Sequence, residues 1–407
     1  MQKKVQEQAH LVRRLSLTLL ILYGLGVTVG AGIYVLVGET ARQAGVYAPV
    51  SFIIAAIVIS FTGFSYAELS TRYPVSAGEA AYVKNGFRSG GFSILVGMLV
   101  VTSGVVSAAA VSIGAGGYLA AFVDVPEPIL VFCIVILLGV IASWGIMESV
   151  SLAAVFTLIE VGGLFYVVWY GLSYNDAIME NSHRLIPTLD HTIWAGILSG
   201  ALLAFFAFVG FEDIANVAEE VKNPTKNMPI AIILTLILAT CIYVAVVSVV
   251  VLSVPIDQLA NSNAPLTLIF GDNSHTQVIV FSGVAVIATV NGVLVQMIMA
   301  SRVLYGLATQ GSLPAFIGQV NSRFRTPVNA TIIVVLTIVA LALFLPIAEL
   351  AKATSTIVLI VFLFVNTALI LIKLRHTPVQ NEIFEVPIIV PILGVVTSIA
   401  LLAVGYI

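Results

Sequence analysis

The sequence predicts an all-α integral membrane protein with about eleven transmembrane helices. Of its 407 residues, 60% are hydrophobic and only 9% are charged, whereas an ordinary soluble domain carries about 25% charged residues. The apolar residues form long runs, each near or above the roughly 18–20 residues that a helix needs to cross about 30 Å of hydrocarbon. These runs cover residues 15–38, 43–67, 89–123, 128–147, 149–175, 192–211, 227–256, 276–301, 326–348, 353–372 and 386–407.

The distribution of basic residues predicts the orientation of these helices. If residues 1–14 form a cytoplasmic N-terminal segment, most lysines and arginines between the spans also fall on the cytoplasmic side. Only Arg42, Arg184 and Lys352 then fall outside. Because an excess of basic residues marks cytoplasmic loops, we expect a multi-pass protein of the cell membrane with a cytoplasmic N-terminus.

Composition and motifs exclude several classes of function. The net charge of −3 is too close to neutral to indicate a nucleic-acid partner, and the sequence contains no G-x-x-x-x-G-K-[S/T] loop for ATP. No cluster of histidine, cysteine or carboxylate residues falls within the spans, so we expect no metal, no cofactor and no enzymatic activity. Cys133 and Cys241 lie in apolar runs, where we expect small buried side chains rather than a disulfide.

The eleven spans divide into two groups of five and one extra helix. Residues 15–175 hold the first group, residues 192–372 hold the second, and residues 386–407 hold the extra C-terminal helix. Because five is odd, the second group enters the membrane from the opposite side, so the two groups can form an inverted repeat. Each group opens with a glycine-interrupted helix, and we expect the helix breaks at Gly30 and Gly210. Interrupted helices at matching positions indicate a transporter's binding site.

The glycines of the first span lower the free-energy cost of local unwinding. Each of Gly26, Gly30 and Gly32 costs a helix about 1 kcal/mol relative to alanine. Freed amides can then bind a carboxylate and freed carbonyls an ammonium, so the main chain can recognise an α-amino acid without a charged side chain. The alternative is that these glycines only allow two helices to pack closely. The second interruption, at Gly210 beside an aromatic cluster, favours the binding site.

Glu160 is the one ionisable residue deep within a long apolar run. Burial disfavours the charged form of a carboxylate, so Glu160 can take up and release a proton near neutral pH. The alternative is a static partner for a serine, a tyrosine or a main-chain amide. Uncharged polar residues of the spans either line a pocket or join helices by hydrogen bonds; they are Ser103, Ser107, Asn291, Gln296 and Ser355.

Five segments resemble, in order, the amino acid, polyamine and organocation (APC) transporter superfamily. They cover residues from about 15 to 330, which makes the resemblance far more specific than any single motif. The segments are Gly30-Ala31-Gly32-Ile33-Tyr34; Tyr66-Ala67-Glu68-Leu69-Ser70-Thr71-Arg72-Tyr73-Pro74; Phe206-Ala207-Phe208-Val209-Gly210-Phe211-Glu212; Glu219-Glu220-Val221-Lys222-Asn223-Pro224; and Ser301-Arg302-Val303-Leu304-Tyr305 with Leu313-Pro314 and Thr326-Pro327.

The resemblance implies a LeuT-like fold of two inverted five-helix repeats, a substrate site between broken helices one and six, and alternating access. It also implies which residues contact the substrate through the main chain, namely Thr28, Ala31, Gly32, Ile33, Phe206, Ala207 and Val209. Phe208 and Phe211 would form an aromatic gate. Proton-coupled relatives often have a lysine in helix five where this chain has Glu160, so a lysine switch does not transfer. Many relatives also have twelve helices rather than eleven.

From these observations we expect a secondary active transporter for a small, neutral amino acid, coupled to protons through Glu160 in symport. The expected partners are therefore an amino acid, protons and the lipid bilayer. An amino acid exchanger and a carrier of cationic amino acids or polyamines are alternatives within the same class. A membrane sensor or complex subunit that does not transport is the alternative from another class, because fold alone does not establish function.

Overall fold

The structure is a computed structural model of the chain. It describes residue 13 and residues 15–75, 78–144, 150–175, 177–271, 275–309, 311, 313–321, 326–375 and 383–405. The cytoplasmic segment expected at residues 1–14 thus lies almost wholly outside the described residues. Within the described part, the regular structure is helical, apart from one isolated β-bridge between Leu15 and Val221.

The predicted all-helical fold is confirmed, and each of the eleven expected spans coincides with one long helix. Short helices connect some of them: α3 (Gly78–Phe87), α7 (Ala177–Asn181), α10 (Ile256–Ala260) and the 3₁₀ segments η1 (Gly45–Tyr47), η2 (Ser182–Leu185), η3 (Phe211–Glu220) and η4 (Pro265–Phe270). The long helices are α1 (Leu17–Ala44), α2 (Ala48–Arg72), α4 (Gly90–Leu119), α5 (Glu127–Trp144), α6 (Val150–Tyr174), α8 (His191–Phe206), α9 (Pro224–Ser253), α11 (His275–Thr309), α12 (Val328–Phe344), α13 (Ile347–Leu374) and α14 (Ile389–Val404).

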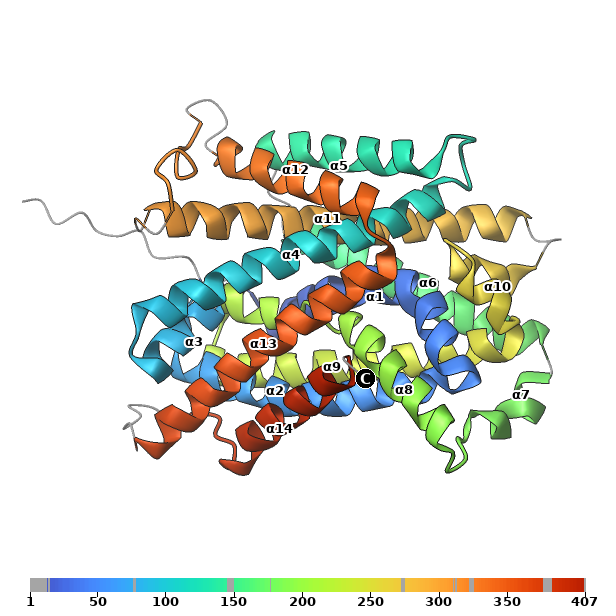
Figure 1. The fold of residues 1–407 in the computed structure, drawn as a ribbon, viewed down its shortest axis with the longest axis horizontal. Helices are drawn as coiled ribbons and strands as arrows, with labels where there is room; N and C mark the ends of the chain where they lie inside the picture. Colours follow the sequence, from blue (N-terminus) through green and yellow to red (C-terminus); the bar gives the residue numbers. More distant parts are fainter. Residues whose placement is uncertain are drawn as a thin grey trace, which may run out of the picture.

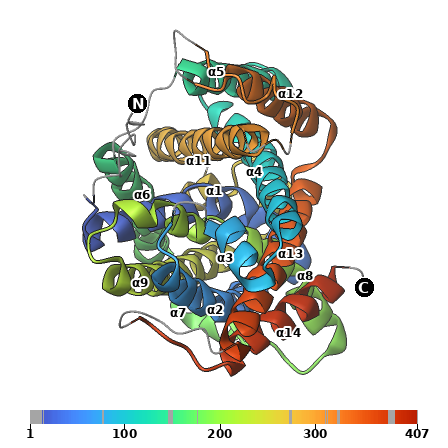
Figure 2. The same ribbon diagram turned by 90° about the vertical axis from the view of Figure 1, so that its left-hand side faces the viewer.

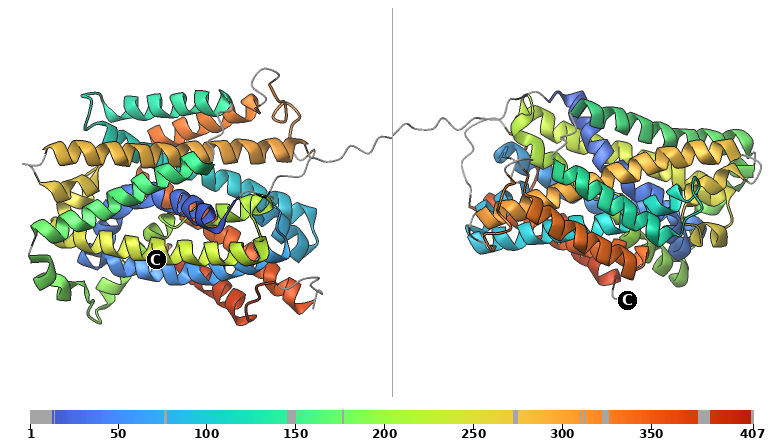
Figure 3. Two further views of the ribbon diagram at one scale, coloured as in Figure 1. Left: turned by 180° about the vertical axis from the view of Figure 1, so that it is seen from behind. Right: turned by 90° about the horizontal axis from the view of Figure 1, so that it is seen from above.

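The helices form a bundle around α1. Helix α1 packs against α6, α8, α9 and α11 and lies near the centre of the bundle when it is viewed end-on (Figure 2). Helices α5 and α12 lie together at one edge, outside α4 and α11, whereas α14 lies at the opposite edge against α13 and α2 (Figure 1). From behind, α6 crosses the bundle at an angle between α11 and α9 (Figure 3).

The outer faces of the bundle are apolar. Leu137 of α5 is 61% exposed and Phe344 of α12 is 83% exposed, as expected for helices that face lipid tails. Cys133 and Cys241 are also exposed, so the expectation that both are buried within the protein is wrong. A bilayer shelters an apolar side chain as well as a protein core does, and apolar sequence therefore does not indicate burial here.

The expected break in the sixth span is present. Helix α8 ends at Phe206, and Gly210 adopts φ +119°, a left-handed conformation that glycine tolerates. Segment η3 then begins at Phe211. In α1, by contrast, the helix runs through Gly30 without a non-helical segment. A helical glycine costs only about 1 kcal/mol, which the packing of neighbouring helices against α1 can offset.

A buried carboxylate joins three elements at the end of the bundle where α3 lies. Glu68 of α2 is fully buried and accepts hydrogen bonds from Arg72 Nε at 2.7 Å, Lys373 Nζ at 2.7 Å and the main-chain amide of Val386 at 2.8 Å. Arg72 also contacts Glu385, which is 57% exposed, at 3.0 Å. Glu68 therefore fixes the end of α13 and the segment before α14 to α2.

Replacing Glu68 with glutamine is expected to destabilise the protein strongly. The change leaves two cations near a neutral amide, and breaking a buried ion pair costs about 3–5 kcal/mol. The unfolding temperature in detergent measures the effect. Glu385→Gln is the matched control, since it removes an exposed partner of the same Arg72 and is expected to cost no more than about 1 kcal/mol. Equal losses in both variants would contradict the proposed role of burial.

Candidate functional site

Helix α1 and the break after α8 touch through glycines. A Cβ atom added to Gly32 would overlap Cα of Ala207, and one added to Gly26 would overlap the Thr157 hydroxyl. A Cβ atom at Gly210 would lie 2.8 Å from the carbonyl oxygen of Val27. The glycines therefore bring main chain against main chain at the centre of the bundle. This is the close packing that was the alternative to unwinding in the first span.

One hydroxyl group joins the same two segments. The Tyr243 hydroxyl of α9 lies 2.8 Å from the carbonyl oxygen of Thr28 and 2.7 Å from that of Ala207. A hydroxyl has a single hydrogen to donate, so Tyr243 cannot satisfy both carbonyls fully at once. The ring of Phe208 packs edge-on against Tyr243 with centroids 5.0 Å apart. Two carbonyls from α1 and α8 thus converge on one donor.

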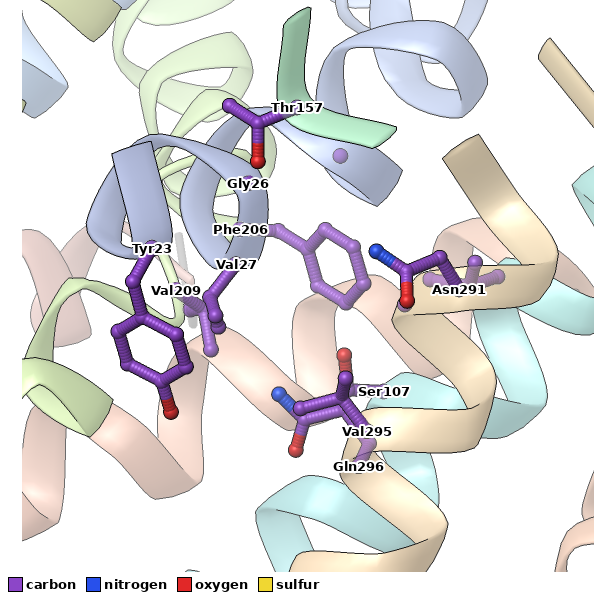
Figure 4. Close-up of a pocket in the computed structure, with 13 residues that line it drawn as sticks. Tyr23, Gly26, Val27, Ser107, Thr157, Phe206, Val209, Asn291, Val295 and Gln296 are labelled. Atoms are coloured by element: carbon purple, nitrogen blue, oxygen red, sulfur yellow. The ribbon is translucent and has the colours of Figure 1, made fainter. Parts of the chain in front are cut away.

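A pocket lies beside this crossing, and we refer to it as the central pocket (Figure 4). Its space not filled by atoms, opening included, is about 590 Å³. Residues of α1, α4, α6, α11 and the α8 break surround it, and none of the described lining residues is charged. They are Tyr23, Gly26, Val27, Gly32, Ser107, Val111, Thr157, Phe206, Val209, Asn291, Gly292, Val295 and Gln296.

The structure places three of the expected substrate contacts in this lining, namely Gly32, Phe206 and Val209. Thr28, Ile33 and Ala207 are buried but do not belong to the lining. The side chain of Ala31 and the surroundings of Gly30 lie outside the described part of the structure. Main-chain contacts from the lining residues remain a prediction.

The two residues expected to form an aromatic gate lie in the protein core. Phe208 packs on Tyr243, and Phe211 packs on Tyr66 and Phe362 with ring centroids 5.5 Å and 5.6 Å apart. Of the three phenylalanines at the break, Phe206 is the one that lines the central pocket, where it points toward Asn291 (Figure 4). Which of the three rings faces the pocket depends on the rotation of the chain at the break, and the motif does not specify that rotation.

Polar residues of α4 and α11 complete the pocket. Ser107, Asn291 and Gln296, considered from the sequence as candidate pocket residues, all line it. Sequence reasoning missed other lining residues, among them Val111 and Val295, although both follow a lining residue at a spacing of four. Side chains four residues apart share one face of a helix, and this spacing is the signal that could have found them.

Glu160 lies next to the central pocket but is not one of its lining residues. Its side chain is fully buried, and Asn291 Nδ2 lies 3.5 Å from its Oε1 atom. The Tyr34 hydroxyl donates to the main-chain oxygen of Glu160 at 2.6 Å. Thr157, one helical turn before Glu160, lines the pocket. Glu160 therefore meets the pocket through Asn291 rather than directly.

Three further carboxylates gather on the α3 side of the pocket. Glu212 Oε2 accepts a hydrogen bond from the main-chain amide of Gly210 at 2.9 Å and so caps the helix break. Asp213 Oδ1 accepts one from Asn216 Nδ2 at 3.3 Å, and Glu79 Oε1 accepts one from the Tyr66 hydroxyl at 3.2 Å. Burial raises the pKa of Glu79, which lies on α3, to about 7.

The raised pKa of Glu79 predicts a pH-dependent stability. Because the folded state favours the protonated form, stability is lost as pH rises from about 4.5 toward 7 and above. Glu79→Gln removes this loss, so at about pH 8 the variant is expected to be more stable than wild type by up to about 3 kcal/mol. The advantage disappears near pH 4. The unfolding temperatures of wild type and Glu79→Gln across this pH range test the expectation. Glu180→Gln, at an exposed position of α7, is the control. A difference independent of pH would contradict the assignment.

The contact between α1 and α8 predicts opposite effects for two glycine-to-alanine changes. Gly32→Ala places a methyl group on the Ala207 main chain and is expected to destabilise by about 1–3 kcal/mol. Gly306→Ala of α11 meets no atom within 4 Å, so improved helix propensity is expected to stabilise it by about 0.5–1 kcal/mol. The unfolding temperatures of the two variants and of wild type in detergent test both expectations. A neutral Gly32→Ala would show that the two helices can separate without cost.

The sequence is similar to those of known membrane transporters. Residues 14–407 match the amino acid permease family. The chain is 29% identical to the vacuolar cationic amino acid transporter 4 of Arabidopsis thaliana, over 91% of this chain and 64% of the relative. It is 27% identical to the branched-chain amino acid permease BcaP of Bacillus subtilis, over 93% and 85% of the two chains. It is 28% identical to the methylthioribose transporter of Bacillus subtilis, over 95% and 87%.

The relatives differ in length and in the substrate that their names give. The chain spans less than two thirds of the plant transporters, 64% of one and 62% of another, but more than four fifths of the two bacterial proteins. The family match, by contrast, covers nearly the whole chain. This multi-pass membrane protein therefore belongs to the amino acid permease family.

Proposed function

We propose that the protein is a secondary active transporter that carries small neutral amino acids through the central pocket. The observation that carries the proposal is the described lining of that pocket, which contains no charged side chain and includes Gly32, Phe206 and Val209. The carboxylate and ammonium of an α-amino acid can be bound by main-chain amides and carbonyls. A substrate with a charged side chain would find no opposite charge in this lining.

The proposed substrate side chain is small and neutral. Val27, Val111, Val295 and the ring of Phe206 offer apolar contacts, while Ser107, Asn291 and Gln296 offer hydrogen bonds. Relatives named for branched-chain and for cationic amino acids leave the substrate class open. The carboxylates on the α3 side favour cationic amino acids as the second candidate, since they provide negative charge near the pocket.

We assign proton coupling to Glu160, which would make the protein a symporter. The side chain is fully buried and lies 3.5 Å from Asn291, which lines the pocket. A change in the charge of Glu160 would therefore affect the pocket through its contact with Asn291. The alternating access that symport requires would move the bundle around α1 and α8, with residues 15–175 and 192–372 as the two inverted repeats. The proposed location is the cell membrane, with the N-terminus in the cytoplasm as the basic residues indicate.

Uptake into proteoliposomes tests the transport proposal. Neutral, branched-chain and cationic amino acids are offered with and without an inward proton gradient, to wild type, Glu160→Gln and the exposed control Glu180→Gln. We expect gradient-driven accumulation of neutral amino acids by wild type and by Glu180→Gln. Glu160→Gln is expected to lose gradient-driven accumulation but to keep exchange of internal for external substrate.

Three other results would overturn parts of the proposal. Uptake that ignores the gradient and requires amino acid trapped inside identifies an exchanger and removes the coupling role of Glu160. Preferential uptake of cationic amino acids supports the second candidate. Absence of movement and of binding for every amino acid would favour a membrane sensor or complex subunit.

A further inference from the structure

A second cavity lies next to the central pocket, toward α3, and we call it the inner cavity. Its space not filled by atoms, opening included, is about 340 Å³, and its lining includes Glu79, Glu212 and Asp213. Two residues, Val209 and Gln296, line both this cavity and the central pocket. The inner cavity is thus separated from the central pocket by these two side chains.

Gln296 of α11 packs against α4. Its side chain is buried, and a Cβ atom at Gly104 of α4 would lie 2.9 Å from its Oε1 atom. Ser103 and Ser107 flank Gly104 on α4, but Ser103 lines the inner cavity whereas Ser107 lines the central pocket. Gln296 lies beside Ser107 in the central pocket (Figure 4). The boundary between the two spaces therefore falls within one turn of α4.

The two spaces differ in charge. The described lining of the central pocket carries no charged side chain, whereas three carboxylates line the inner cavity. The ion pairs that the structure describes involve other acids, namely Glu39, Glu68 and Glu385. A cavity lined by one sign of charge raises the local concentration of the opposite charge. Above about pH 7, where Glu79 is ionised, a positive group that passes Gln296 therefore enters a region of favourable potential.

Gln296 is better suited than Val209 to open this boundary. The side chain of glutamine has three rotatable bonds and polar atoms that can exchange hydrogen-bond partners. Valine is restricted to few rotamers by its branched Cβ. Val209 is moreover held in the turn that follows α8, where its amide donates to the Phe206 carbonyl at 3.1 Å.

We propose that Gln296 is the barrier between the central pocket and an acid-lined exit cavity on the α3 side, and that a substrate ammonium group passes it on leaving. The passage of substrate rests on the transport function proposed above. The barrier itself does not, because it concerns the access of any small molecule to Ser107. Its test therefore needs no transported substrate.

Thiol labelling on the two sides of Gln296 tests the barrier. In a background of Cys133→Ser and Cys241→Ser, Ser103→Cys and Ser107→Cys place matched thiols one helical turn apart. The probe is the impermeant cationic reagent 2-(trimethylammonium)ethyl methanethiosulfonate, applied to sealed vesicles from the α3 side. Labelling of Asn85→Cys, which is exposed on α3, identifies that side, and the unfolding temperature of each variant in detergent shows whether it is folded.

We expect the thiol at 103 to react at least about tenfold faster than the thiol at 107. Adding Gln296→Ala is expected to raise the rate at 107 by about tenfold and to leave the rate at 103 nearly unchanged. Gln258→Ala, which truncates an exposed glutamine of α10, is the control and should change neither rate. Gly104→Ala, whose methyl group displaces the Gln296 amide, should also raise the rate at 107 and replaces Gln296→Ala if that variant misfolds.

Charge selectivity tests the acid lining separately. The anionic reagent 2-sulfonatoethyl methanethiosulfonate is expected to label the thiol at 103 more slowly than the cationic reagent does, and Glu79→Gln should reduce this difference. Equal rates at 103 and 107 before any change at Gln296 would disprove the barrier. An unchanged rate at 107 in both Gln296→Ala and Gly104→Ala would place the barrier elsewhere. If uptake assays fail while the labelling pattern holds, the transport proposal fails and the barrier stands.

Discussion

The structure depends on one constraint, which is that a helix ending inside a membrane must have its main-chain groups bonded within the protein. Helix α8 ends at Phe206, in the middle of the bundle, and two side chains supply the missing partners. The Glu212 carboxylate accepts from the Gly210 amide, and the Tyr243 hydroxyl lies within hydrogen-bond distance of the Ala207 carbonyl. Gly32 of α1 packs directly against the main chain of Ala207 at this point.

The described lining of the central pocket contains no charged side chain. In the transport function proposed above, main-chain amides and carbonyls near the break would bind both ends of an amino acid. Glu160 stands behind Asn291, and three carboxylates lie on the far side of Gln296. The proposed separation of binding, coupling and exit follows from this arrangement.

The α3 end of the bundle and its centre are held together by different kinds of contact. At the α3 end, Glu68 binds Arg72, Lys373 and the amide of Val386, and so ties together helices far apart in the chain. Burying a carboxylate is costly unless its partners are fixed. The centre, in contrast, is held by glycine contacts and by hydroxyl groups. The described ion pairs of Glu68 thus lie at the α3 end and not in the lining of the central pocket.

The sequence by itself determined the membrane environment and the helix count, because long apolar runs act locally, and it also predicted the break at Gly210. It also identified Ser107, Asn291 and Gln296 as candidates, since polar residues in apolar helices are few. Tertiary structure decided that α1 stays helical through Gly30, that Phe206 rather than Phe208 or Phe211 enters the pocket, and that Glu79 lies near Asp213. Each of these depends on how helices distant in sequence rotate and pack against one another, which no local pattern encodes.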